Sequence, residues 1–474
     1  MRGVWRWIIG ESAGPPRHPF ILGGAALAVA ATVLLLVALL PASNSTAPPV
    51  PPASRRPAQA TTTQPEARAT PGSGVNASPQ VFTPPTTIAD NCSTDVGNAL
   101  RSWLWDLPRG TPTRPLVVDF PKNSCYLVNE ALYLRGMTST TFDGNGAEFL
   151  QIDPTVQAIG PLPTTQPYCG AHVDNQSGTS PSTIPIIWWF EGGCDITITD
   201  MEIVGPDTTG VVGSQNDSGI QLSGVQRALI DQDTVRNVDG DFITLTGLHE
   251  GSEQAGGGMS SYPSTNITIR GNTFSRSGRQ GITPQYVDGV TITGNSFRGV
   301  AATEIDLEAD TVGGCACNVD VDHNTFAGLD PYLVAGLTGL SIEHFSFIDN
   351  ELTDGAQMKI QLAPELPSSD IVISGNSGNA GSTWPWPTIG IAYSVQGDSS
   401  AAVTDVRVSG NSIPAPATGR PFVRAGSQAA NVVVSTNVIS GPTGTTPLLD
   451  DGRGSNRSCG NTAGPYGPGL DGVC

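Results

Sequence analysis

The 474-residue chain carries 42 acidic and 23 basic residues, which gives a formal net charge of −19. Residues 1–89 hold a net charge of +4, so residues 90–474 hold −23 and disfavour nucleic acid and other polyanions as partners. With 57 glycines, 39 prolines and 38% hydrophobic residues, the chain is rich in turns but has enough apolar side chains for a large core.

Residues 20–40 contain no charged side chain and are almost entirely apolar. A helix of this length spans about 30 Å, which is the thickness of a bilayer's hydrocarbon core. Arg2, Arg6 and Arg17 precede the segment, so the charge bias places residues 1–19 in the cytoplasm and the bulk of the chain outside the cell. We therefore expect a single-pass cell-membrane protein, although Pro41-Ala-Ser43 leaves a cleaved signal peptide open.

Residues 41–89 consist mainly of Pro, Ala, Ser and Thr, which predicts an extended, disordered linker. Residues 90–458 form the folded domain in this interpretation, and residues 459–474 form a C-terminal tail.

All eight cysteines follow the apolar segment, which fits an oxidising compartment. We expect disulfides among six of them: Cys92, Cys125, Cys169, Cys194, Cys459 and Cys474. Cys92 with Cys125 would close the N-terminal end of the domain, and Cys459 with Cys474 the tail. Cys315-Ala-Cys317 leaves a metal site open, but no second cysteine pair lies nearby in sequence.

The folded domain opens with a predicted amphipathic helix over residues 94–104. A repetitive β protein has to cover the open end of its core, because a free strand edge invites aggregation. This helix is the expected cap.

A short alternating strand followed by Asn, any residue and an apolar residue recurs along the chain. The first clear copy is Thr268-Ile-Arg-Gly-Asn272-Thr-Phe274. The marked asparagines are Asn272, Asn295, Asn324, Asn350, Asn376, Asn411 and Asn437, which are 23, 29, 26, 26, 35 and 26 residues apart, and weaker copies end at Asn145, Asp200 and Asp233. A period in the twenties with alternating strands predicts an all-β solenoid of about ten coils, in which the asparagines stack as a ladder.

The run Phe120-Pro-x-x-x-x-Tyr126-x-Val, followed by Leu132-Tyr-Leu and Phe142-Asp-Gly-Asn-Gly, resembles the first coil of right-handed parallel β-helix proteins of the pectin-lyase-like superfamily. The resemblance covers residues 92–455 and implies the fold. That superfamily includes polysaccharide lyases, glycoside hydrolases, epimerases, tailspikes and surface proteins, so the fold alone does not select a function. Asn237-Val-Asp239-Gly-Asp241 weakly resembles a polygalacturonase motif, whose companion motifs are absent.

After each asparagine mark comes a second strand, and aligning its apolar residues stacks the polar residues between them in two rows. One row holds Gln221, Thr244, Thr283, Asp306 and Lys359, and the other holds Ser223, Thr246, Gln285, Glu308 and Gln361. Such a face suits an extended sugar chain. Candidate substrate-binding residues are Gln221, Gln285, Tyr286, Gln361, Trp384 and Trp386.

Glu304, Asp306 and Glu308 alternate with Ile305 and Leu307, so we expect all three acids to project outward. Alternate residues of a strand are about 6.6 Å apart, a spacing that suits paired catalytic carboxylates. Asp306 and Glu308 are the main catalytic candidates, supported by Glu304, Asp241 and Lys359. Binding of Ca²⁺ by the three acids and a solvated acidic stripe remain open as alternatives.

Four segments interrupt the period, at residues 151–193, 247–265, 309–316 and 377–388, and insertions in a solenoid often wall its binding face. The sequence therefore predicts a monomeric cell-surface protein that binds, and in one interpretation cleaves by hydrolysis or elimination, a polysaccharide or cell-wall glycan. A non-catalytic surface or adhesion solenoid is the alternative.

Overall fold

The computed structural model describes residues 78–153, 186–206, 217–249, 260–308, 314–328, 332–338, 340–379, 386–394, 397–414, 420–440, 446–451 and 455–463. The chain divides into two units, residues 1–71 and 72–474, and every described residue belongs to the second. The predicted membrane segment 20–40 lies outside the described residues. Within them, no helix is long and apolar enough to cross a membrane.

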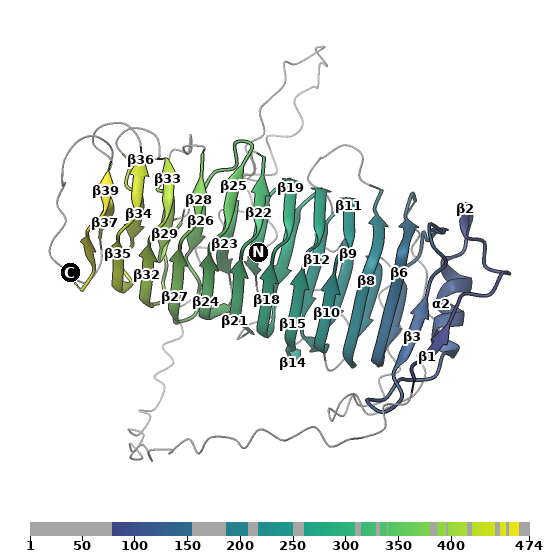
Figure 1. Ribbon diagram of the computed structural model, residues 1–474. Coiled ribbons are helices and arrows are strands. Elements are labelled where there is room, and N and C mark those ends of the chain that lie inside the picture. The colour runs from purple at the N-terminus through teal and green to yellow at the C-terminus, as the bar shows by residue number, and fades with distance from the viewer. Residues whose placement is uncertain are drawn as a thin grey trace, which may run out of the picture. The chain divides into compact units, whose positions relative to one another are not determined.

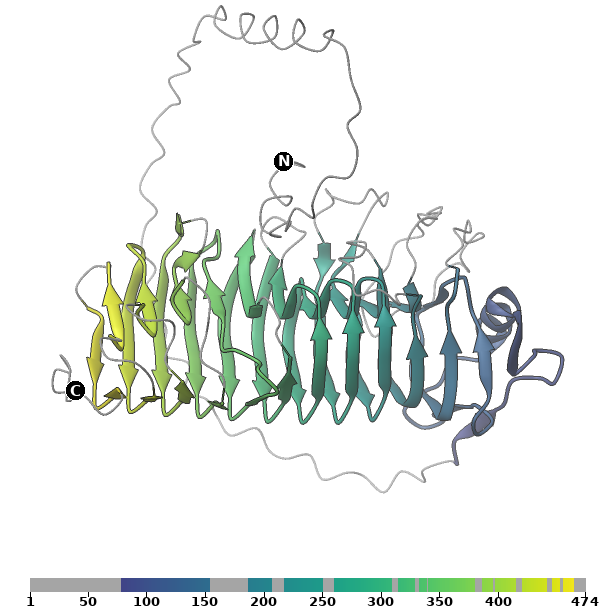
Figure 2. The same cartoon turned by 90° about the horizontal axis from the view of Figure 1, so that it is seen from above.

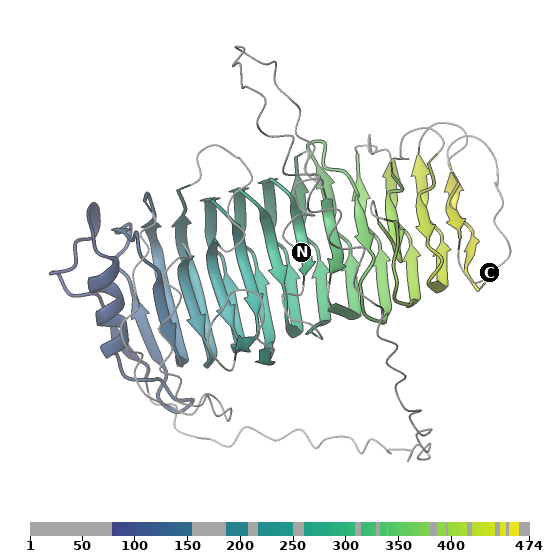
Figure 3. The ribbon, with the colours of Figure 1, turned by 180° about the vertical axis from the view of Figure 1, so that it is seen from behind.

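The second unit is a parallel solenoid in which each strand pairs with its equivalent in the next coil (Figure 1). Three columns of strands run along it, and strand order follows chain order from the N-terminal to the C-terminal end, as Figures 2 and 3 also show from above and from behind. The stacking occurs because each short strand has one apolar face, which is covered only when the next coil lies against it.

The first column contains β1 (Gln80–Phe82), β3 (Leu116–Asp119), β6 (Thr138–Leu150), β8 (Cys194–Val204), β10 (Gln226–Asp231), β15 (Ser264–Arg270), β18 (Val287–Thr293), β21 (Gly314–Asp322), β24 (Leu340–Ile348), β27 (Ser368–Ser374), β32 (Val403–Ser409), β35 (Ala429–Ser435) and β38 (Arg457–Cys459). The second contains β2 (Asn91–Asp95), β4 (Cys125–Leu127), β11 (Thr234–Val238), β16 (Thr273–Ser277), β19 (Ser296–Val300), β22 (Thr325–Ala327), β25 (Glu351–Thr353), β28 (Ser377–Gly378), β33 (Ser412–Pro414), β36 (Val438–Ser440) and β39 (Thr462–Ala463). The long strands β6 and β8 take part in both columns.

The third column is a separate sheet of eleven parallel strands, called here the eleven-stranded sheet. Its members are β5 (Leu132–Arg135), β7 (Ile186–Glu191), β9 (Ser218–Ser223), β12 (Asp241–Thr246), β17 (Gln280–Pro284), β20 (Thr303–Glu308), β23 (Tyr332–Thr338), β26 (Ile360–Leu362), β29 (Ile389–Ile391), β34 (Val423–Ala425) and β37 (Leu448–Asp450). Two small antiparallel hairpins follow strands of this sheet: β13 (Leu248–His249) with β14 (Ser260–Tyr262), and β30 (Tyr393–Ser394) with β31 (Gly397–Asp398).

The interior is one continuous apolar cluster of Ile, Val, Leu and Phe side chains. Phenylalanines of successive coils stack along it: the ring centroids of Phe274 and Phe297 are 4.8 Å apart, and those of Phe297 and Phe326 are 4.9 Å apart. Repetition of the apolar residue after each asparagine produces this stack.

The predicted asparagine ladder is present. The side-chain oxygen of Asn295 accepts hydrogen bonds from the backbone N–H and the Nδ2 of Asn272, at 2.9 and 3.0 Å. Asn272 Nδ2 also donates to the carbonyl of Ile230 in the preceding coil, at 3.0 Å. The same contacts recur in each coil as far as Asn437. They extend to Asn461, which the sequence pattern did not mark.

At the N-terminal end of the ladder, the rung residue is an aspartate instead of an asparagine. Asp233 takes the rung before Asn272, and the backbone N–H of Met201 donates to its Oδ1 at 2.8 Å. The weak copy at Asn145 is not a rung, since its Nδ2 donates to Asp119 and to the carbonyl of Phe120.

The expected cap is the helix α2 (Gly97–Asp106), at the N-terminal end of the solenoid in all three views. Leu100 and Leu104 are fully buried on its inner side. The predicted disulfide between Cys92 and Cys125 joins β2 to β4 beside it. Strand β1 lies within the stretch predicted as linker and pairs with β3, so the ordered part begins before residue 90.

Two sequence interpretations need correction. Residues 186–191 of the supposed insertion 151–193 are β7, a full strand of the eleven-stranded sheet with all six side chains buried. Cys315 and Cys317 form a disulfide with each other, so their thiolates do not bind a metal in this structure. Cys194 and Cys459 are also disulfide-bonded, whereas Cys169 and Cys474 lie outside the described residues.

Candidate functional site

The outer face of the eleven-stranded sheet carries the predicted row of polar side chains. Thr244 is in register with Gln221 of β9 and with Thr283 of β17. Further along, Asp306 is in register with Ala335, and Ala335 with Gln361. The isoleucines beside them, such as Ile243 and Ile305, lie in the core. At these positions the strand alternation therefore assigned the two faces of the sheet correctly.

The position predicted for Lys359 was wrong by two residues. Ile360 pairs with Val334, which pairs with Ile305, so Lys359 falls in the row of Glu304, and Gln361 takes the place expected for Lys359. An alternating pattern specifies the faces of a strand but not its register against the next coil, so it does not detect a shift of two residues.

Glu304 differs from the other two acids of β20. It is fully buried and lies in the row of Leu333, whose side chain belongs to the hydrophobic core. The expectation that Glu304 projects outward with Asp306 and Glu308 is therefore wrong. Asp306 and Glu308 are each 6% exposed.

A cluster of charged and polar groups occupies the middle of the sheet's outer face and is called here the acid cluster. It is built around Arg279, which immediately precedes β17. One terminal nitrogen of Arg279, Nη1, lies 3.1 Å from Oδ2 of Asp241, and the other, Nη2, lies 2.6 Å from Oε2 of Glu308. Because both nitrogens belong to one planar guanidinium, the two carboxylates approach within about 8 Å of each other. Arg279 thereby joins Asp241 of β12 to Glu308 of β20.

Neutral side chains complete the acid cluster. The Thr283 hydroxyl lies 2.7 Å from Oδ2 of Asp241 and 2.7 Å from the Gln280 side-chain oxygen, so it can donate to either. The Gln280 amide nitrogen donates to Oδ2 of Asp306. These contacts join Asp241 of β12 to Asp306 and Glu308 of β20 through side chains at β17, which lies between them.

Burial and charge shift the proton affinities of the acid cluster. Burial raises the pKa of Asp241 from 3.8 to about 6, while Arg279 and the Thr283 hydroxyl act in the opposite direction. The pKa of Arg279 is raised, because Asp241, Glu308 and Asp306 outweigh the effect of its burial. Asp241 can therefore carry a proton near neutral pH, whereas Arg279 stays charged.

Sequence reasoning identified Asp241, Asp306 and Glu308 but missed the groups that join them. Arg279 stands in a turn three residues before Ile282, and strand alternation does not predict where a long side chain in a turn reaches. Gln280 and Thr283 lie on either side of Gly281 and the apolar residue Ile282. Thr283 had been placed in the outward row, without its role as a donor to Asp241.

A second polar network lies on the same face nearer the cap. Tyr133 donates through its hydroxyl to Glu191, which also contacts Arg135 Nε at 3.4 Å. The rings of Tyr133 and Trp189 are 4.6 Å apart between centroids, and the Trp189 indole nitrogen donates to the Ser223 hydroxyl at 3.1 Å.

The remaining predicted binding residues are spread along the sheet. Gln285 is 8% exposed and Tyr286 is half-buried, directly after β17. Trp386 is half-buried near β29, with its ring 6.4 Å from that of Tyr393. Trp384 lies outside the described residues.

The expected walls of a cleft are described only at their bases. Hairpin β13–β14 begins two residues after β12, and most of the segment it carries lies outside the described residues. The same is true of residues 154–185 before β7.

The acid cluster does not fit a calcium site. Ca²⁺ takes six to eight oxygen ligands, but the guanidinium of Arg279 already contacts both Asp241 and Glu308. A second cation beside it would be repelled, so no step below depends on a metal.

Comparison with known proteins identifies the fold. Residues 186–444 match the family described as right handed beta helix region. Among solved structures, the DFA-IIIase of Arthrobacter chlorophenolicus A6 in complex with GF2 is 11% identical with a TM-score of 0.50, covering 81% of this chain and 94% of that one. The exopolygalacturonase of Thermotoga maritima is 11% identical with a TM-score of 0.49, covering 82% and 92%.

A third similar structure is the A-module of the mannuronan C-5 epimerase AlgE6 from Azotobacter vinelandii, 14% identical with a TM-score of 0.48, covering 81% of this chain and 96% of that one. No curated protein matches the sequence. At 11% identity and a TM-score of 0.50, the similarity to the DFA-IIIase shows the fold alone.

Proposed function

The chain belongs to the right-handed β-helix family, and we propose that it binds an extended polysaccharide across the outer face of the eleven-stranded sheet and hydrolyses a glycosidic bond at the acid cluster. The observation that carries this proposal is the pairing of two differently placed carboxyl groups, Asp241 and Glu308, around Arg279. Glycoside hydrolysis needs one carboxylic acid and one carboxylate close together.

Asp241 is the proposed general acid. Its pKa of about 6 keeps a useful fraction protonated in mildly acidic solution. It gives its proton to the leaving glycosidic oxygen as the bond to the anomeric carbon breaks.

Glu308 is the proposed base, and Arg279 holds its carboxylate in place. Glu308 accepts a proton from the attacking water, whose oxygen bonds to the anomeric carbon. Asp306, oriented by Gln280, adds negative charge beside the developing oxocarbenium ion.

Elimination by a lyase is less well supported. It requires a base that removes a carbon-bound proton, and an arginine serves only when it is neutral. The raised pKa of Arg279 keeps its guanidinium charged, so this arginine is unsuited to that role. Hydrolysis by carboxyl groups needs no such change of charge.

Membrane anchoring belongs to the same proposal. Residues 20–40 would span the cell membrane once, with the solenoid outside as a monomer. The Cys92–Cys125 disulfide supports an extracytoplasmic location, because such bonds persist in oxidising compartments. A cell-wall or environmental glycan is then the accessible substrate.

The test is release of new reducing ends from a panel of neutral and acidic polysaccharides by the purified full chain. Asp241→Asn and Glu308→Gln should each reduce the rate by about 10²–10⁴-fold. Asp354→Asn and Glu351→Gln make the same chemical changes at exposed positions in or just after β25, outside the acid cluster, and should have no effect. Equal activity in all four variants would remove the basis for this assignment.

A non-catalytic glycan-binding surface solenoid is the second candidate, and one observation favours it. The carboxyl groups of the acid cluster are almost entirely buried, with Asp241 only 1% exposed. A purely structural network would look the same. In that case the panel gives glycan binding without cleavage, and Asp241→Asn changes stability alone.

A further inference from the structure

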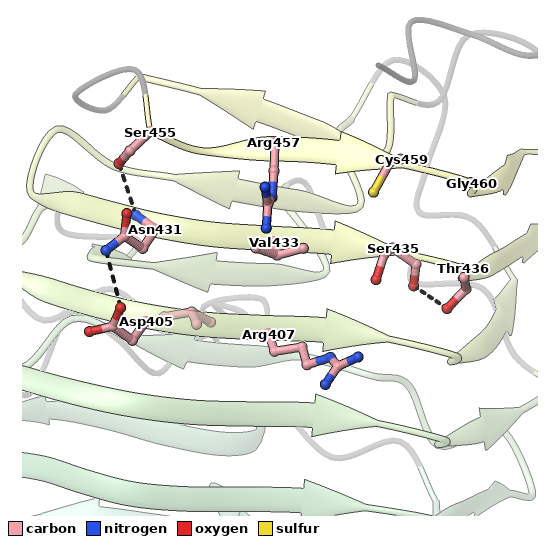
Figure 4. Close-up of a pocket in the computed structure, with 11 residues that line it drawn as sticks. Asp405, Arg407, Asn431, Val433, Ser435, Thr436, Ser455, Arg457, Cys459 and Gly460 are labelled. Atoms are coloured by element: carbon pink, nitrogen blue, oxygen red, sulfur yellow. Dashed lines mark hydrogen bonds between the residues drawn. The ribbon is translucent and has the colours of Figure 1, made fainter. Parts of the chain in front are cut away.

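A pocket lies on the outer face of the first column near its C-terminal end, away from the eleven-stranded sheet (Figure 4). Its volume is about 920 Å³, and its lining includes Arg407 of β32, Val433 of β35 and Arg457 of β38. We call it the arginine pocket.

The two arginines are set by the register of the coils. Arg407 pairs with Val433, and Val433 pairs with Arg457. Their backbones are therefore two strand spacings apart, or about 9.6 Å, with only an apolar side chain between them. Both arginines are exposed. In Figure 4 the side chain of Arg457 extends toward Val433, and that of Arg407 is directed away from Asp405.

Neither guanidinium forms an ion pair with a carboxylate among the described residues. Five other arginines each pair with an acid of another coil: Arg227 with Asp195, Arg236 with Glu202, Arg270 with Asp231, Arg298 with Asp354 and Arg424 with Asp451. The arginine pocket departs from this rule.

The one acid that lines the arginine pocket is already engaged. Asp405 accepts a hydrogen bond from Asn431 Nδ2 at 3.1 Å, and the backbone N–H of Asn431 donates to the Ser455 hydroxyl at 3.0 Å. These residues form a separate row on the far side of Val433 from Ser435, as Figure 4 shows. The half-buried Ser435 is two residues beyond Val433 and belongs to the pocket lining.

We propose that the arginine pocket binds oxyanion groups, carboxylate or phosphate, carried by a ligand that lies across β32, β35 and β38. An arginine guanidinium forms strong, charge-assisted hydrogen bonds with both groups. Two guanidinium groups without a carboxylate partner among the described residues form a local cationic site on a chain whose net charge of −19 otherwise disfavours anions. The site lies on another sheet from the acid cluster and does not depend on the proposed hydrolysis.

The test is isothermal titration calorimetry of the full chain at low ionic strength with two probes, inorganic phosphate and trigalacturonate. Binding of either probe should weaken about tenfold or more when Arg407→Gln and Arg457→Gln are combined, because charged hydrogen bonds are lost. Arg227→Gln removes the same charge from a paired arginine and should leave binding unchanged.

The two probes distinguish the sources of the oxyanion. Preference for phosphate assigns the pocket to phosphate groups, and preference for trigalacturonate assigns it to sugar-borne carboxylates. Binding should also weaken as sodium chloride is raised, a result that needs no variant. Absence of binding by both probes, or equal binding in the double variant, would overturn the proposal.

Discussion

Asp233 offers a direct test of the asparagine ladder. It occupies a rung position and accepts from Met201 through Oδ1, but its Oδ2 is buried and has no hydrogen-bond partner among the described residues. In the other rungs the equivalent atom is Nδ2, which donates to a carbonyl of the preceding coil and to the next asparagine. By equivalence with those rungs we expect Oδ2 to face acceptors, and only a protonated carboxyl group can donate to them.

The pKa of Asp233 is accordingly raised well above 3.8, because burial disfavours its charged form. A carboxyl group whose pKa is higher in the folded state than in the unfolded state stabilises the fold while it is protonated. That contribution is fully present below about pH 4 and is lost as the pH rises toward the folded-state pKa. We therefore expect Asp233→Asn to stabilise the protein more at pH 8 than at pH 4.

The magnitude follows from two contributions. The new amide adds up to two hydrogen bonds, at about 1 kcal/mol each. At pH 8 the variant also avoids the protonation cost, which is about 1.4 kcal/mol for each unit of pKa elevation. The converse change, Asn272→Asp, removes the same two donors from an interior rung and should destabilise by about 2 kcal/mol at pH 8, with partial recovery at pH 4.

The assay is urea denaturation of the three proteins at both pH values, followed by tryptophan fluorescence. A gain for Asp233→Asn that is the same at pH 4 and pH 8 would refute the protonated-rung explanation. So would an Asn272→Asp variant whose stability does not depend on pH.

Three further perturbations test other parts of the structure. Phe297→Ala removes the middle ring of the phenylalanine stack and should cost about 3–5 kcal/mol in denaturant unfolding; a cost below 1 kcal/mol would mean that the stack is not a continuous core. Arg279→Gln should raise the pKa of Asp241 further, since Arg279 now lowers it, and should shift the alkaline limb of any pH–rate profile upward; an unshifted limb would argue against Asp241 as the acid. Replacing both cysteines of the Cys92–Cys125 disulfide by serine should cost about 3–4 kcal/mol, but about 1–2 kcal/mol for Cys315–Cys317, because their sequence separations are 33 and 2; equal losses in calorimetric scans would contradict this order.

The fold was predictable because its determinants are local and repeated. Each copy such as Thr268–Phe274 specifies a strand, a bend and an inward apolar residue, and stacking follows from repetition. The sequence pattern did not mark Asn461, because the residue two positions later is Ala463, a much smaller apolar residue than the Phe, Leu or Ile of other copies. The pattern also missed strand β7, because its sequence, Ile-Ile-Trp-Trp-Phe-Glu, does not alternate between apolar and polar residues and therefore reads as part of an insertion.

The candidate site was predictable only in part. Alternation placed Asp306 and Glu308 on the outer face, but it could not fix the register that separates Lys359 from them. The contact that organises the acid cluster comes from Arg279, a turn residue whose reach across three strands depends on the assembled sheet. Proton affinity, likewise, depends on burial that only the folded coils create.

The pH dependence of glycan cleavage tests the central claim most directly. With Asp241 as the general acid, kcat/KM of the wild-type chain on its best polysaccharide should fall as the pH rises through about 6, where that carboxyl group loses its proton. The Asp241→Asn variant should lack this limb and retain only a low, flat rate. A rate that stays constant or increases between pH 5 and pH 8, or a panel on which the wild-type chain cleaves nothing, would contradict the proposed role of the acid cluster.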